Sequence, residues 1–470
     1  MNKKFLVTTF FFFCLFLQTV SAQILSGTIT DIVENSEAAR TSKFGIYICE
    51  MKSGITIYEN NPDIPMIPSS NLKLLVSASA LHYLGSDYTY KTKIYGTPID
   101  KERGVMESSL YLVGSGDPTF CEPYMNPLSV LETFANELSR KGLRRIIGDV
   151  IGDDSAFDRQ FTGRAWKERY MLDSYSAQCG GLSLNANLVQ ITAHNGLLSF
   201  FPDTTIMNVK NITSPSGYSE INVKRKSGSN DVEISGPLAP EISDGATITV
   251  HNPPLFATNT FGKILQNQGI FQIGSVKLIE ENNKKYEYND FVELCSHESP
   301  KLINILKDMN KESDNLLSQH VFKAIGAEIN GKGTQDLSEA AVKSFMRELG
   351  VNTKGLVMAD GCGLSEENKI TARQLVDLLS YMYDHKEGKN FISTLPQAGV
   401  DGTLRYRMSG NKVFAKTGTI DGCSSLAGYV WTANENIVVF AIISNEHELG
   451  QAVYKGFEDL LVDTIAHSEL

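Results

Sequence analysis

Apolar positions follow two different spacings along the chain, and these spacings divide it into regions. Residues 43–60 alternate apolar and polar side chains on both sides of a turn at residues 52–54, which predicts a β-hairpin. From Leu72 to Leu84 the apolar positions follow helical spacing. Strand and turn patterns dominate from about residue 90 to 290. Helical spacing returns at Leu302 and predicts four helices, in LINILKDM, NLLSQHVFKAIGAEI, EAAVKSFMREL and TARQLVDLLSYMYDH.

The chain ends in three strand patterns and a helix. VFAKTGTI, SSLAGYVWT and NIVVFAIIS are joined by short turns, which predicts an antiparallel meander, and a helix is expected from about residue 448. We therefore expect an α+β fold built on a split domain. Residues 23–89 and 290–470 would form an αβ sandwich with helices on both faces of an antiparallel sheet. Residues 90–289 would form a large inserted β-rich region with two subdomains.

The N-terminal residues predict a signal peptide at 1–22. Lys3 and Lys4 precede an apolar stretch from Phe5 to Leu17, and small residues follow at a candidate cleavage site. The apolar stretch is short for a membrane anchor, which is the alternative interpretation. Cys14 follows three phenylalanines, where a lipoprotein signal has small residues. We expect an exported protein without a transmembrane anchor, located in the periplasm.

Charge and cysteine content narrow the possible partners. The formal charge of −11 becomes −13 once Lys3 and Lys4 are removed, which argues against nucleic acid as a partner. The six cysteines of the mature chain are widely spread and form no CxxC pair, so no disulfide framework is inferred. The histidines form no HExxH motif, and we expect no metal and no cofactor. The sequence carries no signal of an oligomeric state.

Ser70 and Lys73 form the first candidate chemical motif, SxxK. Three residues apart at the start of a helix, their side chains would point the same way. A serine hydroxyl needs a neighbouring base to become a nucleophile, and a lysine can serve if burial keeps it neutral. The motif alone is weak, because Ser409 and Lys412 match it in a turn. The alternative is a capping serine beside a solvated lysine.

Two further motifs strengthen this interpretation. Ser313-Asp314-Asn315 immediately precedes an apolar helix, and Lys416-Thr417-Gly418 lies in a predicted strand. SxxK followed by SDN and KTG is the signature of class A β-lactamases and penicillin-binding proteins. A competing set of Ser70, Ser183 and Lys226 has the same order. It is rejected because Ser183 begins no periodic helix and Lys226 lies in a polar turn.

With these motifs the chain resembles the D-alanyl-D-alanine carboxypeptidases of peptidase family S13, the penicillin-binding protein 4 type of low-molecular-mass class C. The resemblance extends over nearly the whole mature chain, and the 243 positions between Ser70 and Ser313 match the large insertion of that family. Compact β-lactamases place these motifs much closer together. Cys362 is a departure, since the family usually has serine there, and we expect an altered contact without loss of activity. The segments that carry the resemblance are IPSSNLKLL, YLVGSGDPTF, IIGDVIGDDSAFD, LSLNAN, KESDNLLSQHVF, DGCGLSEENKITARQLVDLL, LPQAGVDGTLRYRM and AKTGTIDGCSSLAGYV.

The resemblance implies a mechanism on peptidoglycan stem peptides. Ser70 would attack the carbonyl of the penultimate D-alanine, and Lys73 would take its proton. Ser313 would relay a proton to the leaving amine, and Asn315 would hold the substrate amide. β-Lactam antibiotics would inhibit the enzyme by acylating Ser70 and leaving slowly.

The resemblance also assigns the KTG strand to substrate binding. Lys416 would attract the terminal carboxylate and bias Lys73 toward neutrality. Thr417, Gly418 and Thr419 would line the substrate, with both threonine hydroxyls on that carboxylate. The backbone N–H groups of Ser70 and Thr419 would form the oxyanion hole.

Two aspartates outside the motifs carry weaker expectations. The resemblance places Asp173 near the cleft, where it would meet the amino group of a diaminopimelate side chain; the alternative is an ordinary loop aspartate. Asp117, in GSGDPTF, is interpreted as a turn residue.

Three functions remain open on sequence alone. The first is a D-Ala-D-Ala carboxypeptidase, with DD-endopeptidase activity on cross-links as a variant. The second is a serine β-lactamase, for which the run Glu366-Glu367-Asn368 lacks the required spacing. The third is a non-catalytic penicillin-binding scaffold that retains the fold.

Overall fold

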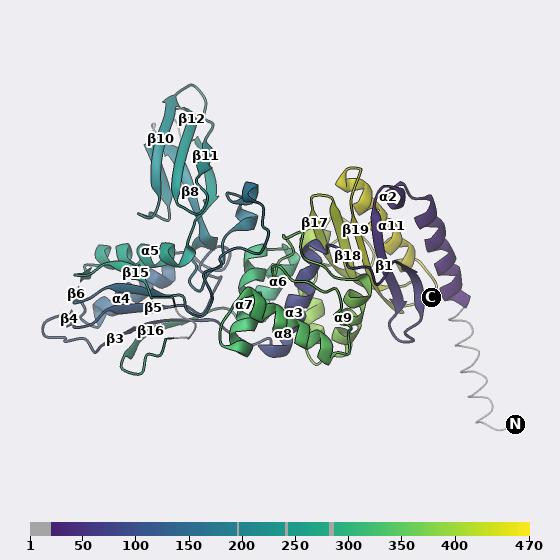
Figure 1. The fold of residues 1–470 in the computed structure, drawn as a ribbon, viewed down its shortest axis with the longest axis horizontal. Helices are drawn as coiled ribbons and strands as arrows, with labels where there is room; N and C mark the ends of the chain where they lie inside the picture. The colour runs from purple at the N-terminus through teal and green to yellow at the C-terminus, as the bar shows by residue number, and fades with distance from the viewer. Residues whose placement is uncertain (1–19, 195–196, 240–242, 282–285) are drawn as a thin grey trace. The chain divides into compact units, whose positions relative to one another are not determined.

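The predicted hairpin forms one edge of a five-stranded antiparallel sheet in the computed structural model, which describes residues 20–194, 197–239, 243–281 and 286–470 (Figure 1). The sheet order is β17-β18-β19-β1-β2. Because β19 pairs with β1, the C-terminal meander is joined to the N-terminal hairpin. Both predictions are thereby confirmed. The strands are β1 (Lys43–Glu50), β2 (Thr56–Asn60), β17 (Val413–Ile420), β18 (Cys423–Trp431) and β19 (Ile437–Asn445).

Helices cover both faces of this sheet. On one face α11 (Gln451–Ala466), α2 (Glu37–Arg40) and the helical residues 20–35 share a core with the strands. On the other face lies α9 (Ala372–Asp384), and the Tyr429 hydroxyl of β18 donates to the Leu379 carbonyl of α9 at 2.6 Å. Burial on both faces explains why β18 and β19 read as nearly continuous apolar runs. The predicted αβ sandwich is confirmed.

The described residues form two compact units. The first extends to Ser86 and also includes residues 306–314 and 342–470. Its other helices include α3 (Leu72–Tyr83), which confirms the helix predicted from Leu72, and α10 (Gly388–Thr394). The second unit contains residues 87–305 and 315–341, so residues 290–305 and 315–341 fall in it, although the sequence assigned them to the catalytic domain. The other predicted helices are α6 (Leu302–Lys311), α7 (Asn315–Asn330) and α8 (Gln335–Glu348).

The second unit contains a mixed sheet packed against two helices. The sheet order is β15-β7-β5-β3-β16, and a small sheet β14-β6-β4 lies in the same unit. The helices α4 (Ser129–Arg140) and α5 (Pro253–Asn267) were not predicted, and they contribute Phe134, Phe256 and Phe261 to this core. The strands are β3 (Lys91–Gly96), β4 (Val105–Met106), β5 (Leu110–Val113), β6 (Arg145–Ile146), β7 (Val150–Asp153), β14 (Phe271–Gln272), β15 (Val276–Leu278) and β16 (Val292–Glu298).

Two three-stranded sheets complete the second unit, with orders β13-β8-β9 and β10-β12-β11. A small core of Ile191, Val232, Ile234 and Ile248 joins them. The predicted large β-rich insertion is thus confirmed in character, and it holds two separate hydrophobic clusters. The strands are β8 (Leu188–His194), β9 (Leu197–Phe201), β10 (Asn208–Pro215), β11 (Asn222–Arg225), β12 (Asp231–Leu238) and β13 (Ser243–Thr249).

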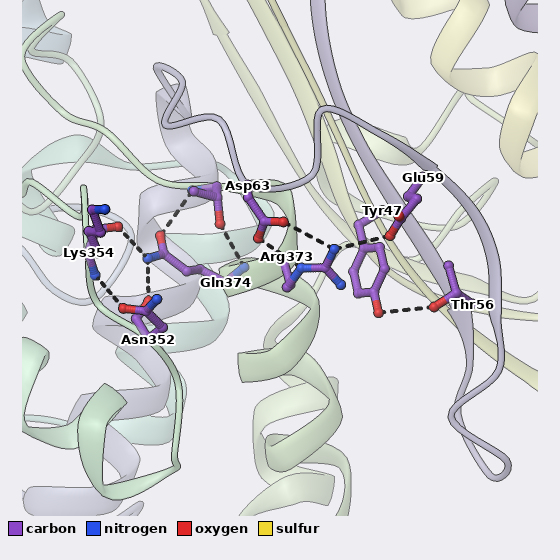
Figure 2. A network of polar contacts seen from close by, with 9 residues as sticks. Tyr47, Thr56, Glu59, Asp63, Asn352, Lys354, Arg373 and Gln374 are labelled. Atoms are coloured by element: carbon purple, nitrogen blue, oxygen red, sulfur yellow. Dashed lines mark hydrogen bonds and ion pairs between the residues drawn. The ribbon is translucent and has the colours of Figure 1, made fainter.

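A polar network in the first unit fixes the segment that leads to Ser70 (Figure 2). The Arg373 guanidinium lies 4.2 Å from the Tyr47 ring centre and binds Asp63 and Glu59. The backbone N–H of Arg373 also donates to the Pro62 carbonyl at 3.0 Å. These contacts tie the hairpin and residues 59–63 to the start of α9. Thr371 and Gln374 cap that helix by reciprocal hydrogen bonds.

The predicted signal peptide, residues 1–22, lies almost wholly outside the described residues, which begin at residue 20. In the part of the chain that is described, no helix combines the length and the apolar character needed to cross a bilayer. Ala22 and Leu25 already contribute to the core of the first unit.

Candidate active site

Ser70 and Lys73 contact each other at the start of α3. Ser70 lies in the 3₁₀ turn Ser69–Asn71, which continues directly into the helix, and the Lys73 Nζ donates to its Oγ at 3.0 Å. Ser70 is half-buried, whereas Lys73 is completely buried. The alternative of a solvated lysine is therefore wrong. An accessible hydroxyl beside a hidden amine is the arrangement that a nucleophile and its base require.

The surroundings of Lys73 favour its neutral form. Burial lowers the pKa of the Lys73 ammonium, although the nearby carboxylates of Asp314 and Asp360 act in the opposite direction. Its Nζ also donates to the Cys362 carbonyl oxygen at 2.7 Å. This second contact fixes the amine in place, so that it faces Ser70 in either protonation state.

The loop at residues 360–365 supplies that carbonyl and packs against the nucleophile turn. The buried Asp360 carboxylate accepts N–H bonds from Cys362 (3.0 Å), Gly363 (2.7 Å) and Ser365 (2.6 Å). Gly363 has a φ of 91°, and a Cβ there would clash with the Ser69 carbonyl oxygen. Only glycine therefore allows this close approach.

Lys416 and Ser313 form a second pair in the same unit. The Lys416 Nζ donates to the Ser313 Oγ and to the Thr417 carbonyl, both at 2.9 Å. Burial and the charge of Lys73 place the pKa of Lys416 well below its ordinary value. Gly418, the last residue of KTG, lies against the Pro68 carbonyl and Ser69, directly before Ser70. SxxK, KTG and the serine of SDN are thus brought to one region.

The KTG strand, β17, lies directly against the nucleophile turn. A Cβ on Gly418 would clash with Ser425 Oγ and come within 2.9 Å of the Pro68 carbonyl oxygen. The Ser425 hydroxyl donates to that Pro68 carbonyl at 2.7 Å. Thr417 is buried and donates to Thr403 Oγ1 at 2.7 Å, whereas Thr419 is exposed. Gly418 thus permits the close approach of the strand.

Sequence analysis missed the residues that support these motifs, namely Thr403, Asp360 and Ser425. DGCGLS and SSLAGYV were noted only as parts of the resemblance. The signal that could have drawn attention to Asp360 is the Asp-Gly-Cys-Gly run, which is typical of a tight loop.

Asn315 and Asp173 belong to the second unit, and both contact Tyr175. Asn315 begins α7 and donates through Nδ2 to the Tyr175 carbonyl at 2.9 Å. The exposed Asp173 carboxylate accepts a hydrogen bond from the Tyr175 hydroxyl at 2.7 Å. These contacts fix the segment at residues 173–175 to the start of α7.

Sequence analysis left Asp117, Ser183 and Lys226 out of the candidate site. The surroundings of these three residues differ from those of the motif residues. Asp117 is buried, its Oδ1 accepts from Thr119 N–H and Oγ1, and burial raises its pKa to about 6. This is the geometry of a turn residue. Ser183 is buried beside His320, and Lys226 is exposed.

Comparisons with known proteins agree with this geometry. The family model described as D-Ala-D-Ala carboxypeptidase 3 (S13) matches residues 25–467. The chain is 30% identical to the D-alanyl-D-alanine carboxypeptidase of Actinomadura sp. (strain R39), over 89% of this chain and 80% of the relative. It is 24% identical to the D-alanyl-D-alanine carboxypeptidase DacB of Haemophilus influenzae, over 87% and 86% of the two chains.

A solved structure supports the fold independently. The crystal structure of penicillin binding protein 4 (dacB) from Haemophilus influenzae matches with a TM-score of 0.78 and 24% identity, covering 92% of this chain and 98% of that one. The family match spans nearly the whole chain, including all three motifs. The chain belongs to the D-Ala-D-Ala carboxypeptidase 3 (S13) family and is a serine-type D-Ala-D-Ala carboxypeptidase.

Proposed function

We propose that this enzyme releases the terminal D-alanine of peptidoglycan stem peptides through an acyl-enzyme on Ser70. The observation that carries the proposal is the 3.0 Å contact between the half-buried Ser70 hydroxyl and the completely buried Lys73 amine. Ser70 Oγ would attack the carbonyl carbon of the penultimate D-alanine while its proton passes to Lys73. The resulting tetrahedral adduct would then lose D-alanine as an amine.

The leaving amine needs a proton, and Ser313 is suited to relay one. Its hydroxyl accepts a hydrogen bond from Lys416 Nζ, a buried amine with a depressed pKa. The proton that Lys73 took from Ser70 would pass through Ser313 to the leaving amine, so that Lys73 is neutral again. Water would then attack the ester carbon while Lys73 takes a proton from it. Lys73 would pass this proton to Ser70 Oγ as the ester C–O bond breaks, which releases the shortened peptide and free Ser70. Each step moves one proton between named groups and needs no cofactor.

The remaining predicted residues would bind substrate. Lys416, Thr417, Gly418 and Thr419 would receive the terminal carboxylate, and the N–H groups of Ser70 and Thr419 would stabilise the oxyanion. Removing one such donor typically slows acyl transfer by about 10²–10³-fold. Asn315 would hold the substrate amide. Asp173 would meet an amino group of the stem peptide, with Tyr175 orienting its carboxylate.

β-Lactams are proposed as covalent inhibitors of the same serine. Solved relatives include penicillin binding protein 4 of Haemophilus influenzae complexed with a β-lactam and a penicillin G-acylated predatory endopeptidase of Bdellovibrio bacteriovorus. The latter supports DD-endopeptidase activity as a second candidate, because cutting a cross-link uses the same acylation step. Substrates of this kind place the working enzyme outside the cytoplasm, and we propose the periplasm.

The test is the intact-protein mass after incubation with benzylpenicillin, with Ser70→Ala and Ser183→Ala as matched variants. We expect a stable gain of one penicillin mass on the wild type and on Ser183→Ala, and none on Ser70→Ala. No adduct without drug consumption would instead support a non-catalytic scaffold. Rapid drug loss without an adduct would support a serine β-lactamase.

A separate assay distinguishes the two peptidase activities. Free D-alanine released from a pentapeptide measures carboxypeptidase activity, and cleavage of a cross-linked dimer measures endopeptidase activity. Both rates should disappear together in Ser70→Ala. Activity that survives in this variant would contradict the acyl-enzyme.

A further inference from the structure

A pocket of about 330 Å³ lies wholly within the second unit. It is formed by the 3₁₀ helix Glu168–Tyr170, the end of β11 and the residues that follow β13. None of its lining residues belongs to the three motifs. The residues that determine its chemistry are Trp166, Tyr170, Gln178, Arg225, Ser227 and His251.

Arg225 is a cation without an anionic partner in this pocket. Its two terminal nitrogens donate to the carbonyls of Met171 (2.7 Å) and Thr249. Its Nε is buried and has no hydrogen-bond partner among the described residues, and no acidic side chain among them acts on its charge. Burial lowers the pKa of Arg225 to about 10, so the guanidinium stays charged at neutral pH. A half-buried charge of this kind is costly unless a counter-charge meets it.

The neighbouring histidine presents a donor as well. The Gln178 Oε1 accepts the Asn252 N–H at 3.0 Å, which assigns its Nε2 as the donor to His251 Nδ1 at 3.2 Å. His251 therefore carries its proton on Nε2 in the neutral ring. Burial and the charge of Arg225 lower the pKa of His251, which favours the neutral ring at neutral pH.

The remaining lining includes two aromatic residues and one further cation beside small polar residues such as Thr162 and Ser176. Trp166 and Tyr170 supply apolar ring surface, and Lys167 adds a second positive side chain. Glu168 is the one acidic residue of the lining, and it is exposed. The pocket therefore combines positive charge and N–H donors with an apolar wall.

We propose that this pocket binds a carboxylate-bearing segment of the stem peptide, apart from the bond that is cut. The volume is at the lower end of the roughly 300–1,000 Å³ typical of small-ligand sites, which suits one or two amino acids. Stem peptides carry the required carboxylate on their D-glutamate residue. This inference rests on the proposed function for its choice of ligand, whereas the preference for an anion rests on Arg225.

Tryptophan fluorescence tests the proposal directly. The chain has two tryptophans, so Trp431→Phe leaves Trp166, in the pocket, as the only one. This protein is first acylated with benzylpenicillin and then titrated with N-acetyl-L-alanyl-D-glutamate. We expect a saturable change in fluorescence, and at least tenfold weaker binding of the same dipeptide with both carboxylates amidated. Equal binding of the two dipeptides would overturn the proposal.

Two charge variants in the Trp431→Phe background locate the site. Ser227 is exposed and lines the pocket, so Ser227→Asp adds a negative charge there while leaving the carbonyl contacts of Arg225 intact. Ser214→Asp adds the same charge on an exposed position of β10 outside the pocket. We expect at least tenfold weaker dipeptide binding in Ser227→Asp and unchanged binding in Ser214→Asp. Wild-type affinity in Ser227→Asp would overturn the proposal.

Two controls separate the possible failures. Sodium phosphate that competes as well as the dipeptide would show an unselective anion site and overturn the stem-peptide assignment. Release of D-alanine from a diacetylated tripeptide by the Trp431→Phe protein measures the proposed function alone. If this protein releases D-alanine but does not bind the dipeptide, the pocket proposal fails while the proposed function stands.

Discussion

Both units of the molecule hold a serine hydroxyl beside a nitrogen base. In the first unit, Ser70 Oγ lies 3.0 Å from Lys73 Nζ, and in the second, Ser183 Oγ lies 2.8 Å from His320 Nε2. A backbone carbonyl holds each base, that of Cys362 at 2.7 Å and that of Leu316 at 2.9 Å. The distance between hydroxyl and base therefore does not distinguish a candidate catalytic pair from a structural one.

Access and hydrogen-bond saturation do distinguish them. Ser70 is half-buried and so can meet a substrate, whereas Ser183 is only 5% exposed. Because His320 Nδ1 donates to the Leu316 carbonyl, Nε2 must accept from the Ser183 hydroxyl, which in turn accepts from Asn187 Nδ2 at 3.0 Å. These contacts make Ser183 and His320 part of the interior of the second unit, whereas the hydroxyl side of the first pair, at Ser70, is only half-buried.

The largest expected difference between the two pairs is in the acylation rate after the base of each pair is replaced. Lys73→Met keeps the length of the side chain but removes the group that would take the Ser70 proton. Loss of a general base typically slows catalysis by about 10²–10⁴-fold, and we expect that loss in the acylation rate with benzylpenicillin. His320→Gln should leave the acylation rate per folded molecule within about twofold. Stopped-flow acylation of both variants measures the difference.

The amount of folded protein is the necessary control, since His320 lies in a core. Far-UV circular dichroism and penicillin-titrated active-site concentration normalise the two rates. The proposed difference between the two pairs would be contradicted if Lys73→Met were acylated as fast as the wild type. It would also be contradicted if His320→Gln lost acylation while remaining folded.

The next effect is a pH dependence of stability that comes from His320 in the second pair. Burial lowers the pKa of His320 from 6.5 to about 4 in the folded chain. Below pH 6.5 His320 is protonated in the unfolded chain but not in the folded chain. Its contribution to the free energy of unfolding is therefore complete above this pH and decreases as the pH falls toward 4. The shift corresponds to at most about 3 kcal/mol.

Urea unfolding of wild type and His320→Gln between pH 4 and 7 isolates this contribution. Asp117 acts in the opposite direction, because its raised pKa of about 6 makes stability fall as the pH rises from about 4 to 6. The difference between the two unfolding curves removes the contribution of Asp117, which both proteins share. A difference that stays constant across this range would show that His320 does not titrate as proposed.

Truncating the two serines should separate stability from activity. Ser183→Ala leaves His320 Nε2 and Asn187 Nδ2 without their buried partner, which typically costs about 1–3 kcal/mol of unfolding free energy. Ser70 is half-buried, so Ser70→Ala should leave the free energy of unfolding nearly unchanged. Denaturant midpoints at pH 7 measure both. Equal losses in the two variants would remove the distinction between the pairs.

The fourth comparison concerns the loop that holds the base Lys73 in place. Asp360→Asn replaces one carboxylate oxygen by an amide NH₂ and so removes an acceptor from the loop at residues 360–365. The Cys362 carbonyl would then shift relative to Lys73. Misplacement by about 1 Å typically costs up to 10²-fold in rate, and we expect an acylation rate about 10–10²-fold lower.

A change in the pH profile tells this positioning effect from simple destabilisation. If the Lys73 amine moves, its pKa changes. The pH range over which the acylation rate rises should then shift along the pH axis. A lower rate with an unchanged pH range would indicate that the loop supports the fold without positioning the base.

Local sequence patterns predicted the hairpin, the meander and the helix from Leu72, because each depends on neighbouring side chains. The sequence also contains the signals of two helices that were not predicted. In α4 the buried positions 130, 131, 134, 135 and 138 follow helical spacing, and α5 begins with Asn252 as its cap followed by Pro253. Both were read as part of a strand-rich region because strands surround them.

The supporting contacts of the candidate site could not be predicted in the same way. Asp360 and Ser425 matter because the loop and β18 approach the turn at residue 70, and that approach is decided by packing between distant segments. The pocket around Arg225 similarly brings together residues from three separate parts of the chain, between Thr162 and Gln178, at Arg225–Gly228 and at His251. Spacing along the sequence carries no information about such encounters.

The smallest expected effect is at Cys362, where the resemblance to the family led us to expect serine. Lys73 contacts the backbone carbonyl of Cys362, and that carbonyl is present whatever the side chain. Burial raises the pKa of the thiol well above its ordinary value, so the side chain is a neutral group beside the amine. Cys362→Ser substitutes a neutral group of similar size, and the acylation rate should stay within about twofold. A larger loss, at unchanged unfolding free energy, would mean that the sulfur itself affects Lys73, and the backbone carbonyl would not suffice to hold the base.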